Sequence, residues 1–229
     1  MAERFTSAII VAAGDSTRMG YRLSKQLIPL NGHPAIEYTL KAFEDCALID
    51  EIIVVARSQD IEDIAQIAFG FKKVGSVTAG GATRTQSVKN GLRAASKRAT
   101  HYAIHDGARV LITPALIEKI LHAAYDCGAA APGTPVTDTV KVADDNGVIL
   151  STPDRSCMWA VQTPQVFERE LYKRAMNHAL MNDLAVTDDC SMAEAIGEKV
   201  QIVRGDYANI KLTTPVDLTL AEALLAKRK

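Results

Sequence analysis

Residues 7–32 read SAIIVAAGDSTRMGYRLSKQLIPLNG, and this stretch combines an apolar run, a glycine turn and three cations. The run at 6–12 is short and apolar, which predicts a strand covered on both faces, as in a parallel sheet. The turn comes at Gly14, and the cations extend from Arg18 to Lys25. Backbone N–H groups and cations that follow a buried strand are typical of a site for an anionic ligand.

The alternation of strands and helices continues beyond this stretch and predicts the fold class. Further apolar runs predict strands at 51–56, 73–78 and 101–105. Helical spacing predicts helices at 34–46, 58–69, 84–97 and 114–127. This order predicts an α/β protein with a doubly wound, mostly parallel sheet of the Rossmann-like kind. Ligands bind outside the carboxyl ends of such strands, so the loops that begin at Ala13, Gly80 and Asp106 are expected to share one edge.

The pattern changes after about residue 134. Residues 136–143 alternate between apolar and polar, a strong turn follows at 144–147, and 148–151 continue the pattern, which predicts a β-hairpin. Helices are predicted at 167–182, at 189–196 and from 215, with a strand at 200–204. Since no linker or repeat divides the chain, we expect one domain over 1–229, with 136–158 as a protruding β-hairpin arm.

The composition excludes several classes of protein. The chain has 229 residues and a net charge of −1, which gives no basic excess for nucleic acid or an anionic membrane. No apolar run approaches the roughly 20 residues of a membrane span, and the segment before the first strand is expected to be too short for a signal peptide. The four cysteines lie far apart, which favours reduced thiols over zinc or disulfides. These features predict a cytoplasmic protein.

The loop after the first strand lacks the usual phosphate-binding fingerprints. Ser16 stands where G-x-G-x-x-G would place a second glycine after Gly14, and no Walker-type G-x-x-x-x-G-K-[ST] occurs. Its backbone N–H groups, with Arg18 and Lys25 reaching inward, could still hold a triphosphate. The alternative is a solvated loop whose cations face water.

Two further clusters follow the later strands. The stretch GGATRTQS at 80–87 has two glycines that permit a ligand to approach, and Ser87 stands in the first turns of the next helix, where simple capping is the alternative. The stretch HDGAR at 105–109 ends a buried strand, so Asp106 either orients the next loop or binds Mg²⁺ beside a phosphate. His105 is interpreted as a structural histidine.

Six motifs occur together, in order and across nearly the whole chain: AAGDSTRM…SKQ, GGATRTQSVKNGL, HDGAR, WAVQTPQVF, VTDDCS and IKLTTPVDL. This set resembles the 2-C-methyl-D-erythritol 4-phosphate cytidylyltransferases of the non-mevalonate isoprenoid pathway. The first motif alone indicates only a nucleotidyltransferase, whereas the last four belong to the acceptor side. Two positions depart from the family pattern: Ser16 replaces a glycine, and Val110 follows HDGAR where proline is usual.

The resemblance implies a role for each motif residue. Arg18 and Lys25 would stabilise the transition state around the α-phosphate of CTP. The cytidine would be surrounded, chiefly by backbone groups, at Ala12, Ala13, Gly14, Gly81, Ala82, Ser87 and Gly107. The methylerythritol phosphate would be held by Asp106, Arg109, Arg155, Thr163, Thr187 and Lys211. Asp106 would also bind Mg²⁺.

The resemblance also implies a reaction and its partners. The acceptor's phosphate oxygen would attack the α-phosphorus of CTP, and pyrophosphate would leave, with Mg²⁺ as the cofactor. That oxygen is already anionic, so the obstacle is repulsion, which amounts to about 4 kcal/mol for two unit charges about 4 Å apart at an effective dielectric near 20. The arm at 136–158 would cross to a second copy in a homodimer and complete its site.

Three alternatives remain open from the residues alone. A related cytidylyltransferase for another sugar-alcohol phosphate, such as ribitol 5-phosphate, would share the CTP side. A nicotinamide-dependent oxidoreductase would use a similar sheet, but the missing G-x-G-x-x-G pattern argues against it. A non-catalytic nucleotide sensor would bind CTP without releasing pyrophosphate, and the cations expected around the α-phosphate argue against it.

Overall fold

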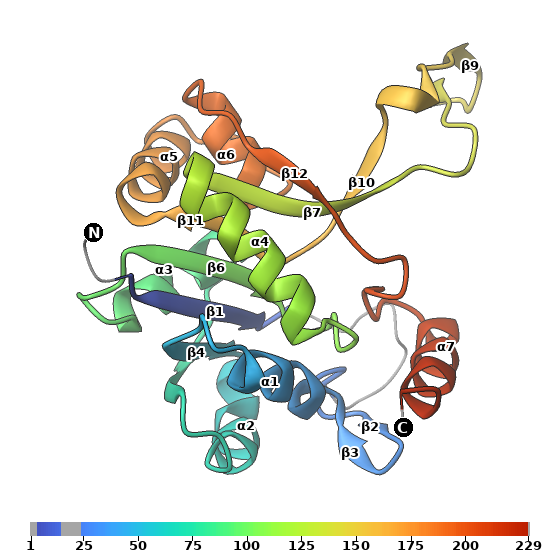
Figure 1. Ribbon diagram of the computed structural model, residues 1–229. Coiled ribbons are helices and arrows are strands. Elements are labelled where there is room, and N and C mark those ends of the chain that lie inside the picture. Colours follow the sequence, from blue (N-terminus) through green and yellow to red (C-terminus); the bar gives the residue numbers. More distant parts are fainter. Residues whose placement is uncertain (1–3, 15–23, 229) are drawn as a thin grey trace.

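Figure 1 shows the chain as a computed structural model, which describes residues 4–14 and 24–228. The first half alternates strands and helices, as the sequence predicts. Its elements are β1 (Thr6–Ala12), β2 (Pro29–Leu30), β3 (His33–Pro34), α1 (Ala35–Asp45), β4 (Glu51–Ala56), α2 (Ile61–Ala68), β5 (Val74–Ala79), α3 (Arg84–Ala94), β6 (His101–Asp106) and α4 (Pro114–Cys127). The helix predicted at 58–69 begins as a 3₁₀ turn over Ser58–Asp60. The short pairing of β2 with β3 is not predicted by the sequence pattern.

Four parallel strands form one side of the sheet in the order β6-β1-β4-β5. Val11 of β1 pairs with Val55 of β4 and with Asp106 of β6, so the carboxyl ends of these strands meet at one edge. The chain leaves β1 toward β4 on one side and reaches β6 on the other, which makes this edge a topological switch point. The predicted doubly wound, mostly parallel sheet is confirmed.

The second half adds strands beyond β6. Its elements are β7 (Ala129–Pro135), β8 (Val142–Ala143), β9 (Ile149–Ser151), β10 (Trp159–Val161), β11 (Gln165–Glu168), α5 (Arg169–Met181), α6 (Asp189–Ala195), β12 (Gln201–Arg204) and α7 (Pro215–Ala226), with a 3₁₀ turn at Arg155–Cys157. β11 inserts antiparallel between β6 and β7, and both β10 and β12 pair with β7. The sequence pattern does not predict β7, β10 or β11.

The helix predicted at 167–182 begins too early. Phe167 and Glu168 instead pair with β6, and α5 starts at Arg169. The Glu168 carboxylate accepts a hydrogen bond from the N–H of Leu171 at 2.7 Å, so Glu168 is the N-terminal cap of α5. Strand pairing with the free edge of β6 thus outweighs the local preference of Phe167 and Glu168 for helix.

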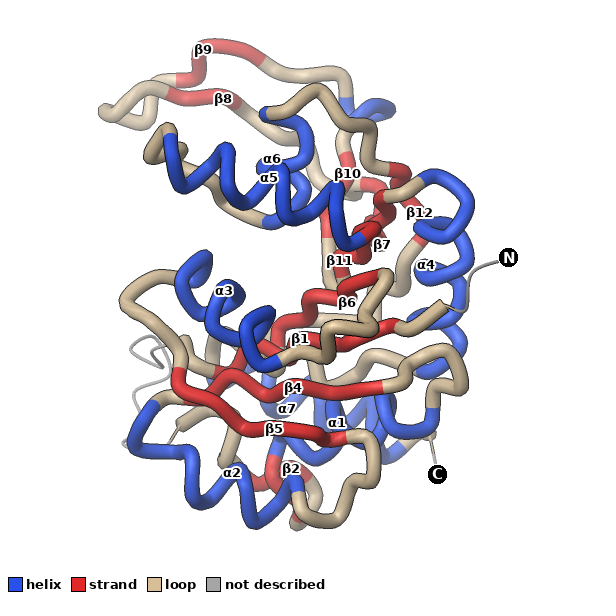
Figure 2. Tube along the Cα trace, turned by 90° about the vertical axis from the view of Figure 1, so that its left-hand side faces the viewer, coloured by secondary structure: helices blue, strands red, loops and turns tan. Residues whose placement is uncertain are grey.

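Helices cover both faces of the sheet (Figures 1 and 2). On one face α1, α2 and α4 bury apolar side chains against β1 and β4. On the other face α3, α5 and α6 pack against the sheet, which explains why the central strands are apolar throughout. Cys46 and Cys190 are buried in these two cores, Cys127 and Cys157 are exposed, and all four are free thiols. Among the helices of the described residues, none is both long and apolar enough to cross a membrane.

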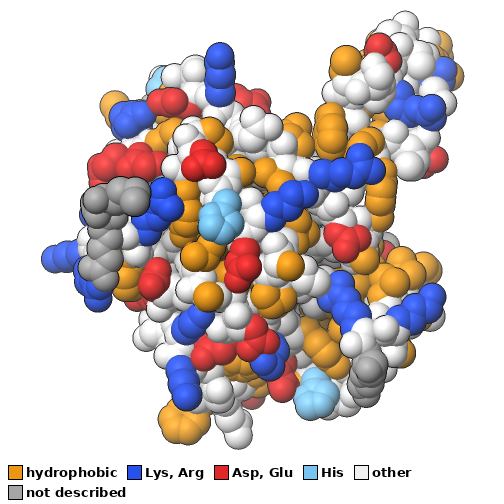
Figure 3. Space-filling view, in the orientation of Figure 1, with side chains coloured by type: hydrophobic (Ala, Val, Ile, Leu, Met, Phe, Trp, Pro, Cys, Tyr) orange, Lys and Arg blue, Asp and Glu red, His pale blue; other side chains and the backbone are white. Residues whose placement is uncertain are grey.

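The arm at 136–158 stands away from the body of the protein (Figures 1 and 3). Its turn is the predicted one: the Asp144 carboxylate accepts two backbone hydrogen bonds across it, and Gly147 has a φ of +80°. The paired strands are shorter than predicted, since only β8 and β9 form a ladder. Residues 137–161 include no buried residue, so the stretch predicted as a strand at 136–143 is not packed against the core within the described part of the chain.

Candidate active site

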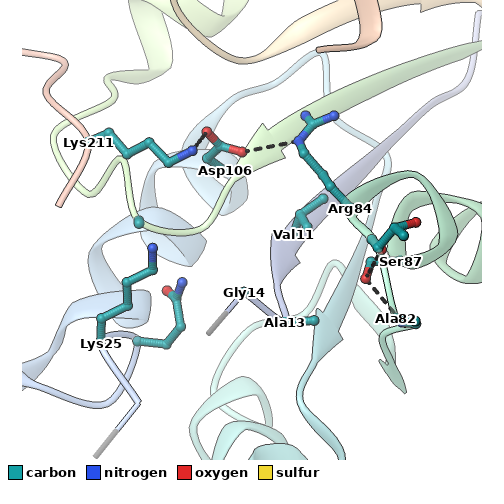
Figure 4. Close-up of a pocket in the computed structure, with 13 residues that line it drawn as sticks. Val11, Ala13, Gly14, Lys25, Ala82, Arg84, Ser87, Asp106 and Lys211 are labelled. Carbon is teal, nitrogen blue, oxygen red and sulfur yellow. Dashed lines mark hydrogen bonds and ion pairs between the residues drawn. The ribbon is translucent and has the colours of Figure 1, made fainter. Parts of the chain in front are cut away.

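A cavity of about 330 Å³ opens where the carboxyl ends of β1, β5 and β6 meet (Figure 4). The three loops expected to share one edge of the sheet all reach it. Of the residues that the sequence analysis selected, the cavity is lined by Ala13, Gly14, Lys25, Gly81, Ala82, Ser87, Asp106 and Lys211. Ala13 and Lys211, which are 198 positions apart in the chain, are therefore brought to one site.

The wall beside α3 is made by backbone, because two glycines let the loops approach closely. A Cβ atom on Gly80 would lie 2.3 Å from the Cβ of Ala13, and one on Gly81 would lie 2.1 Å from the Cγ of Gln86. Neither distance leaves room for a side chain, so both positions need glycine. The Ser87 hydroxyl fixes the same loop by accepting a hydrogen bond from the Gly81 N–H at 3.0 Å.

The first turn of α3 also faces the cavity. The N-terminal cap of this helix is Thr83, whose hydroxyl accepts a hydrogen bond from the Gln86 N–H at 3.1 Å. Ser87 instead donates to the Thr83 carbonyl at 2.9 Å, so simple capping is the wrong interpretation of Ser87. The start of a helix carries a partial positive charge, which favours an anionic ligand at this wall.

Asp106 is held between cations at the opposite side of the cavity. The Nζ of Lys211 lies 2.7 Å from one carboxylate oxygen, and the Nε of Arg84 lies 3.7 Å from the other (Figure 4). The Nε of Arg109 approaches within 4.0 Å. Burial alone would raise the pKa of Asp106, but Lys211 and Arg84 outweigh it and lower the pKa to about 2. Asp106 is therefore an anion at neutral pH.

The side chains around the cavity carry an excess of positive charge. Among the described lining residues, Lys25, Arg84 and Lys211 are cations and Asp106 is the one carboxylate. In Figure 4, Lys25 enters from the side opposite Ser87, and Lys211 and Arg84 reach Asp106 from two sides. Three cations against one anion suit a ligand with several negative charges.

A chain of hydrogen bonds fixes the strand end that carries Asp106. The Thr163 hydroxyl accepts from the Asp106 N–H at 3.0 Å and donates to His105 Nδ1, also at 3.0 Å. His105 Nε2 can then donate to the Arg109 carbonyl at 3.4 Å. Burial lowers the pKa of His105 to about 3, so the ring is neutral at ordinary pH. This arrangement agrees with the interpretation of His105 as a structural residue.

Four selected residues lie next to the cavity without lining it. Ala12 and Gly107 are buried at the ends of their strands, and the Gly107 N–H donates to the Val11 carbonyl at 2.9 Å. Thr163 lies behind Asp106, as described. The Arg109 guanidinium donates to the Asn209 carbonyl at 2.7 Å, and its Nε lies 4.0 Å from Asp106.

Two other selected residues, Thr187 and Arg155, are not brought to the cavity within this chain. Thr187 is exposed in the segment before α6. Arg155 belongs to the arm and donates to the Thr137 carbonyl at 2.7 Å. Arg18 falls outside the described residues.

Arg84 and Asp189 also belong to this region, and neither is predicted from the sequence as a site residue. Arg84 is the first residue of α3 and lines the cavity, and its Nη2 lies 2.6 Å from a carboxylate oxygen of Asp189. Asp189 is the first residue of α6 and is fully buried. The signal for Arg84 was its place just after the two glycines of the 80–87 stretch. A single sequence contains no comparable signal that Asp189, the second aspartate of VTDDCS, would be buried.

Comparison with known proteins identifies the family of this chain. Residues 6–227 match the family model of 2-C-methyl-D-erythritol 4-phosphate cytidylyltransferase, IspD. A protein of that name from Caldanaerobacter subterraneus is 46% identical over 224 residues, which cover 96% of this chain and 99% of that protein. Another, from Alkaliphilus oremlandii, is 43% identical over 227 residues, which cover 98% of this chain and 96% of that protein.

Solved structures show the same fold. The 4-diphosphocytidyl-2C-methyl-D-erythritol synthase of Anaerococcus prevotii superposes with a TM-score of 0.88 at 34% identity and covers 97% of this chain and 99% of its own. The 2-C-methyl-D-erythritol 4-phosphate cytidylyltransferase of Thermus thermophilus superposes with a TM-score of 0.78 at 33% identity, covering 98% of this chain and 100% of its own. The chain therefore belongs to the 2-C-methyl-D-erythritol 4-phosphate cytidylyltransferase family.

Proposed function

We propose that the protein transfers CMP from CTP to 2-C-methyl-D-erythritol 4-phosphate and releases pyrophosphate, as a cytidylyltransferase of isoprenoid precursor biosynthesis. The observation that carries this proposal is the excess of cations around the ionised Asp106 at the switch point of the sheet, in a chain of this family. The family and its relatives are named for methylerythritol phosphate, so ribitol 5-phosphate is not favoured as the acceptor.

The cytidine is proposed to bind along the backbone wall beside α3. The residues assigned to it are Ala12, Ala13, Gly14, Gly81, Ala82, Ser87 and Gly107. The tight glycine contacts and the Ser87 hydrogen bond hold this wall rigid, so its N–H and C=O groups are already oriented for a base. A site matched to the donor and acceptor pattern of cytosine leaves polar groups unpaired against uracil, which gives discrimination between CTP and UTP.

The chemical step is proposed to be an in-line displacement at the α-phosphorus of CTP. A new P–O bond forms from the acceptor phosphate oxygen, and the α-phosphorus bond to the bridging oxygen breaks, with its electron pair leaving on pyrophosphate. Arg18 and Lys25 are assigned to stabilise the charge that develops there. Support for Lys25 comes from its place in the cavity, and support for Arg18 comes from the AAGDSTRM motif. No general base is needed, because the attacking oxygen is already ionised.

The acceptor is proposed to bind on the Asp106 side of the cavity. The residues assigned to it are Asp106, Arg109, Arg155, Thr163, Thr187 and Lys211, with Lys211 and Arg155 on its phosphate. Lys211 is placed for this role because its ammonium faces the cavity beside Asp106.

A homodimer is part of the proposal, with each chain contributing one domain over 1–229 and an arm at 136–158. Arg155 stands on that arm, away from its own cavity, so we assign it to the cavity of a second copy. The apolar side chains of Val148, Ile149 and Leu150 are 59–64% exposed on the arm, which is unusual unless another surface covers them. The four free thiols fit a reducing, cytoplasmic location.

Mg²⁺ is the proposed cofactor, held by Asp106 together with the phosphates of CTP. Within the described residues, no cluster of three or more His, Cys, Asp or Glu side chains is placed to hold a metal ion. This donor set fits Mg²⁺, which keeps several waters and commonly binds through one carboxylate and substrate phosphates. When bound, the ion would neutralise part of the triphosphate charge.

Pyrophosphate release tests the proposed function. The purified protein is incubated with CTP, Mg²⁺ and either methylerythritol 4-phosphate or ribitol 5-phosphate, and UTP replaces CTP in a parallel series. We expect release with CTP and methylerythritol phosphate that exceeds every other combination. Release that is absent in all series, or that is greater with ribitol 5-phosphate, would overturn the proposal.

A further inference from the structure

A buried carboxylate lies directly behind the cavity and is not used by the proposed reaction. Asp189 has no exposed surface, although it is charged and begins α6. One carboxylate oxygen accepts a hydrogen bond from Arg84 Nη2 at 2.6 Å. The other accepts from the Tyr172 hydroxyl at 2.5 Å. A buried carboxylate is costly unless it is paired in this way, so its place behind Arg84 calls for an explanation.

The backbone that carries Asp189 is itself tied to the sheet. The side-chain oxygen of Gln165 accepts hydrogen bonds from the N–H groups of Asp189 at 2.9 Å and Cys190 at 3.1 Å. The side-chain nitrogen of Gln165 donates to Asp188 at 2.8 Å. Gln165 lies on β11 and is 2% exposed. The start of α6 is therefore anchored, and the Asp189 carboxylate is held at a fixed position.

Arg84 contacts two carboxylates, one fully buried and one that lines the cavity. Its Nη2 makes the short contact with the buried Asp189, whereas its Nε lies 3.7 Å from Asp106 at the cavity. Burial opposes the charge on Arg84, but both carboxylates favour it, and the pKa of Arg84 is raised. Burial also disfavours the charged form of Tyr172 and raises the pKa of this residue, so its hydroxyl stays protonated and able to donate. The tighter of the two ion pairs therefore determines how the guanidinium lies.

We propose that Asp189 is a positioning residue that acts through Arg84. Its carboxylate anchors one end of the guanidinium, so that the Nε end stays directed at Asp106 and the charge of Arg84 is presented to the bound nucleotide. This inference rests on the proposed function, because it assumes that the cavity binds a nucleotide triphosphate. It adds a residue from α6 to a site otherwise built from the ends of β1, β5 and β6, the start of α3 and the segments that carry Lys25 and Lys211.

The alternative is that Asp189 only stabilises the fold. Both roles predict a lower melting temperature when the carboxylate is removed. They differ in their dependence on Arg84, because a residue that acts through Arg84 loses its effect on catalysis once Arg84 is gone. A double-mutant cycle separates these cases.

The experiment uses the full chain with the substitutions Asp189→Asn, Arg84→Gln, the two combined, and Tyr172→Phe as the matched control. Tyr172→Phe removes the other hydrogen bond to the same carboxylate and leaves the ion pair in place. For each variant, kcat and the KM for CTP are measured together with the melting temperature.

We expect Asp189→Asn to lower kcat/KM for CTP by about 10-fold to 100-fold, the usual range for losing one hydrogen bond between charged groups. Tyr172→Phe is expected to change it by less than about 3-fold. In the Arg84→Gln background, adding Asp189→Asn is expected to change kcat/KM by less than about 3-fold. Should Asp189→Asn fail to fold, Asp189→Glu retains the charge and displaces the carboxylate, and the same expectation applies to it.

The inference is overturned if the Asp189 variant keeps the wild-type kcat/KM, or if its loss is the same with and without Arg84. Failure of the proposed function is a separate result, since it appears as a wild-type protein that releases no pyrophosphate. In that event, calorimetric titration of the same four variants with CTP still decides the inference. CTP affinity that is lower in Asp189→Asn than in wild type, only when Arg84 is present, supports it, and equal affinities refute it.

Discussion

The cavity and the arm differ in how the surrounding structure holds them. At the cavity, glycine contacts, a helix start and ion pairs determine where each group lies, and Asp106 is nearly buried. Along the arm, residues 137–161 include none that is buried, and its tip depends on hydrogen bonds within its own turn. Both regions contain residues assigned to the same reaction. The described part of the cavity is organised within one chain, whereas the arm has no buried residue from 137 onward.

Because of this difference, we expect the two regions to respond differently to substitution. A substitution at the cavity alters groups that are already in contact within one chain. We therefore expect it to change the activity or the stability of the protein without a second copy. A change on the arm removes little from the isolated chain, and its effect should appear only where a second copy or the acceptor is involved. Substitutions in each region test this contrast between the cavity and the arm.

The largest effect is expected from the cations near the first loop. Lys25→Ala and Arg18→Ala should each lower kcat by about 10²-fold to 10³-fold or more, as expected for removing one preorganised group that meets developing charge. Steady-state pyrophosphate release measures this. Lys41→Ala is the control, because that lysine is exposed and pairs with Asp45 on the outer side of α1. Normal turnover in both cavity variants would remove Lys25 and Arg18 from the mechanism.

The next comparison sets a cavity cation against an arm cation. Lys211→Ala and Arg155→Ala should both raise the KM for the acceptor, by about 10-fold or more, because each removes a charge assigned to its phosphate. They should differ in stability, since Lys211 contacts the buried Asp106, whereas Arg155 is exposed on the arm. Thermal unfolding and acceptor titration measure the two quantities. An unchanged KM in both variants would reject the placement of the acceptor.

A smaller effect is expected from adding a methyl group to the backbone wall. In Gly80→Ala the new Cβ would meet Ala13 at 2.3 Å and the Ser87 hydroxyl at 2.9 Å. Overpacking of this kind should lower the free energy of unfolding by about 1–3 kcal/mol, as measured by denaturant titration. Gly70→Ala is the matched control, because its Cβ would meet nothing closer than 3.6 Å. Equal stability in the two variants would show that the wall can relax.

The sequence predicts the region around the cavity well, and the reasons are local. The apolar runs of β1, β4, β5 and β6 need cover on both faces, which is the property of a parallel sheet. The start of α4 is marked by Pro114, and the helix begins where that signal predicts. Once the strands were placed, the shared edge at their carboxyl ends followed from topology alone.

The rest depends on contacts that no local pattern encodes. β7 reads AAAPGTP, a sequence with little strand preference, and it becomes a strand because β10, β11 and β12 pair with it. Arg84 and Asp189 stand 105 positions apart, and their pairing depends on the tertiary structure that brings the first residues of α3 and α6 together. The strand predicted at 136–143 shows the opposite error, since only Val142 and Ala143 of this alternating stretch form a ladder, and no residue from 137 to 143 is buried.

The smallest expected effect is on the pH dependence of stability. It again distinguishes the two regions, because His105 is buried next to Asp106 of the cavity and the arm contains no histidine. In the folded protein burial lowers the pKa of His105 from 6.5 to about 3. The unfolded chain therefore binds a proton that the folded one excludes, and stability falls as the pH drops below about 6.5, by about 1 kcal/mol per pH unit.

The substitution His105→Gln should remove that part of the slope. Denaturant titrations between about pH 6.5 and pH 4.5 measure it, a window above the range from 3.8 to about 2 in which Asp106 gains its own proton. The arm variant Arg155→Ala should keep the wild-type slope, since it changes neither the number nor the burial of histidines. A His105→Gln slope equal to that of the wild type would mean that the ring can be protonated in place, and burial would then not hold it neutral.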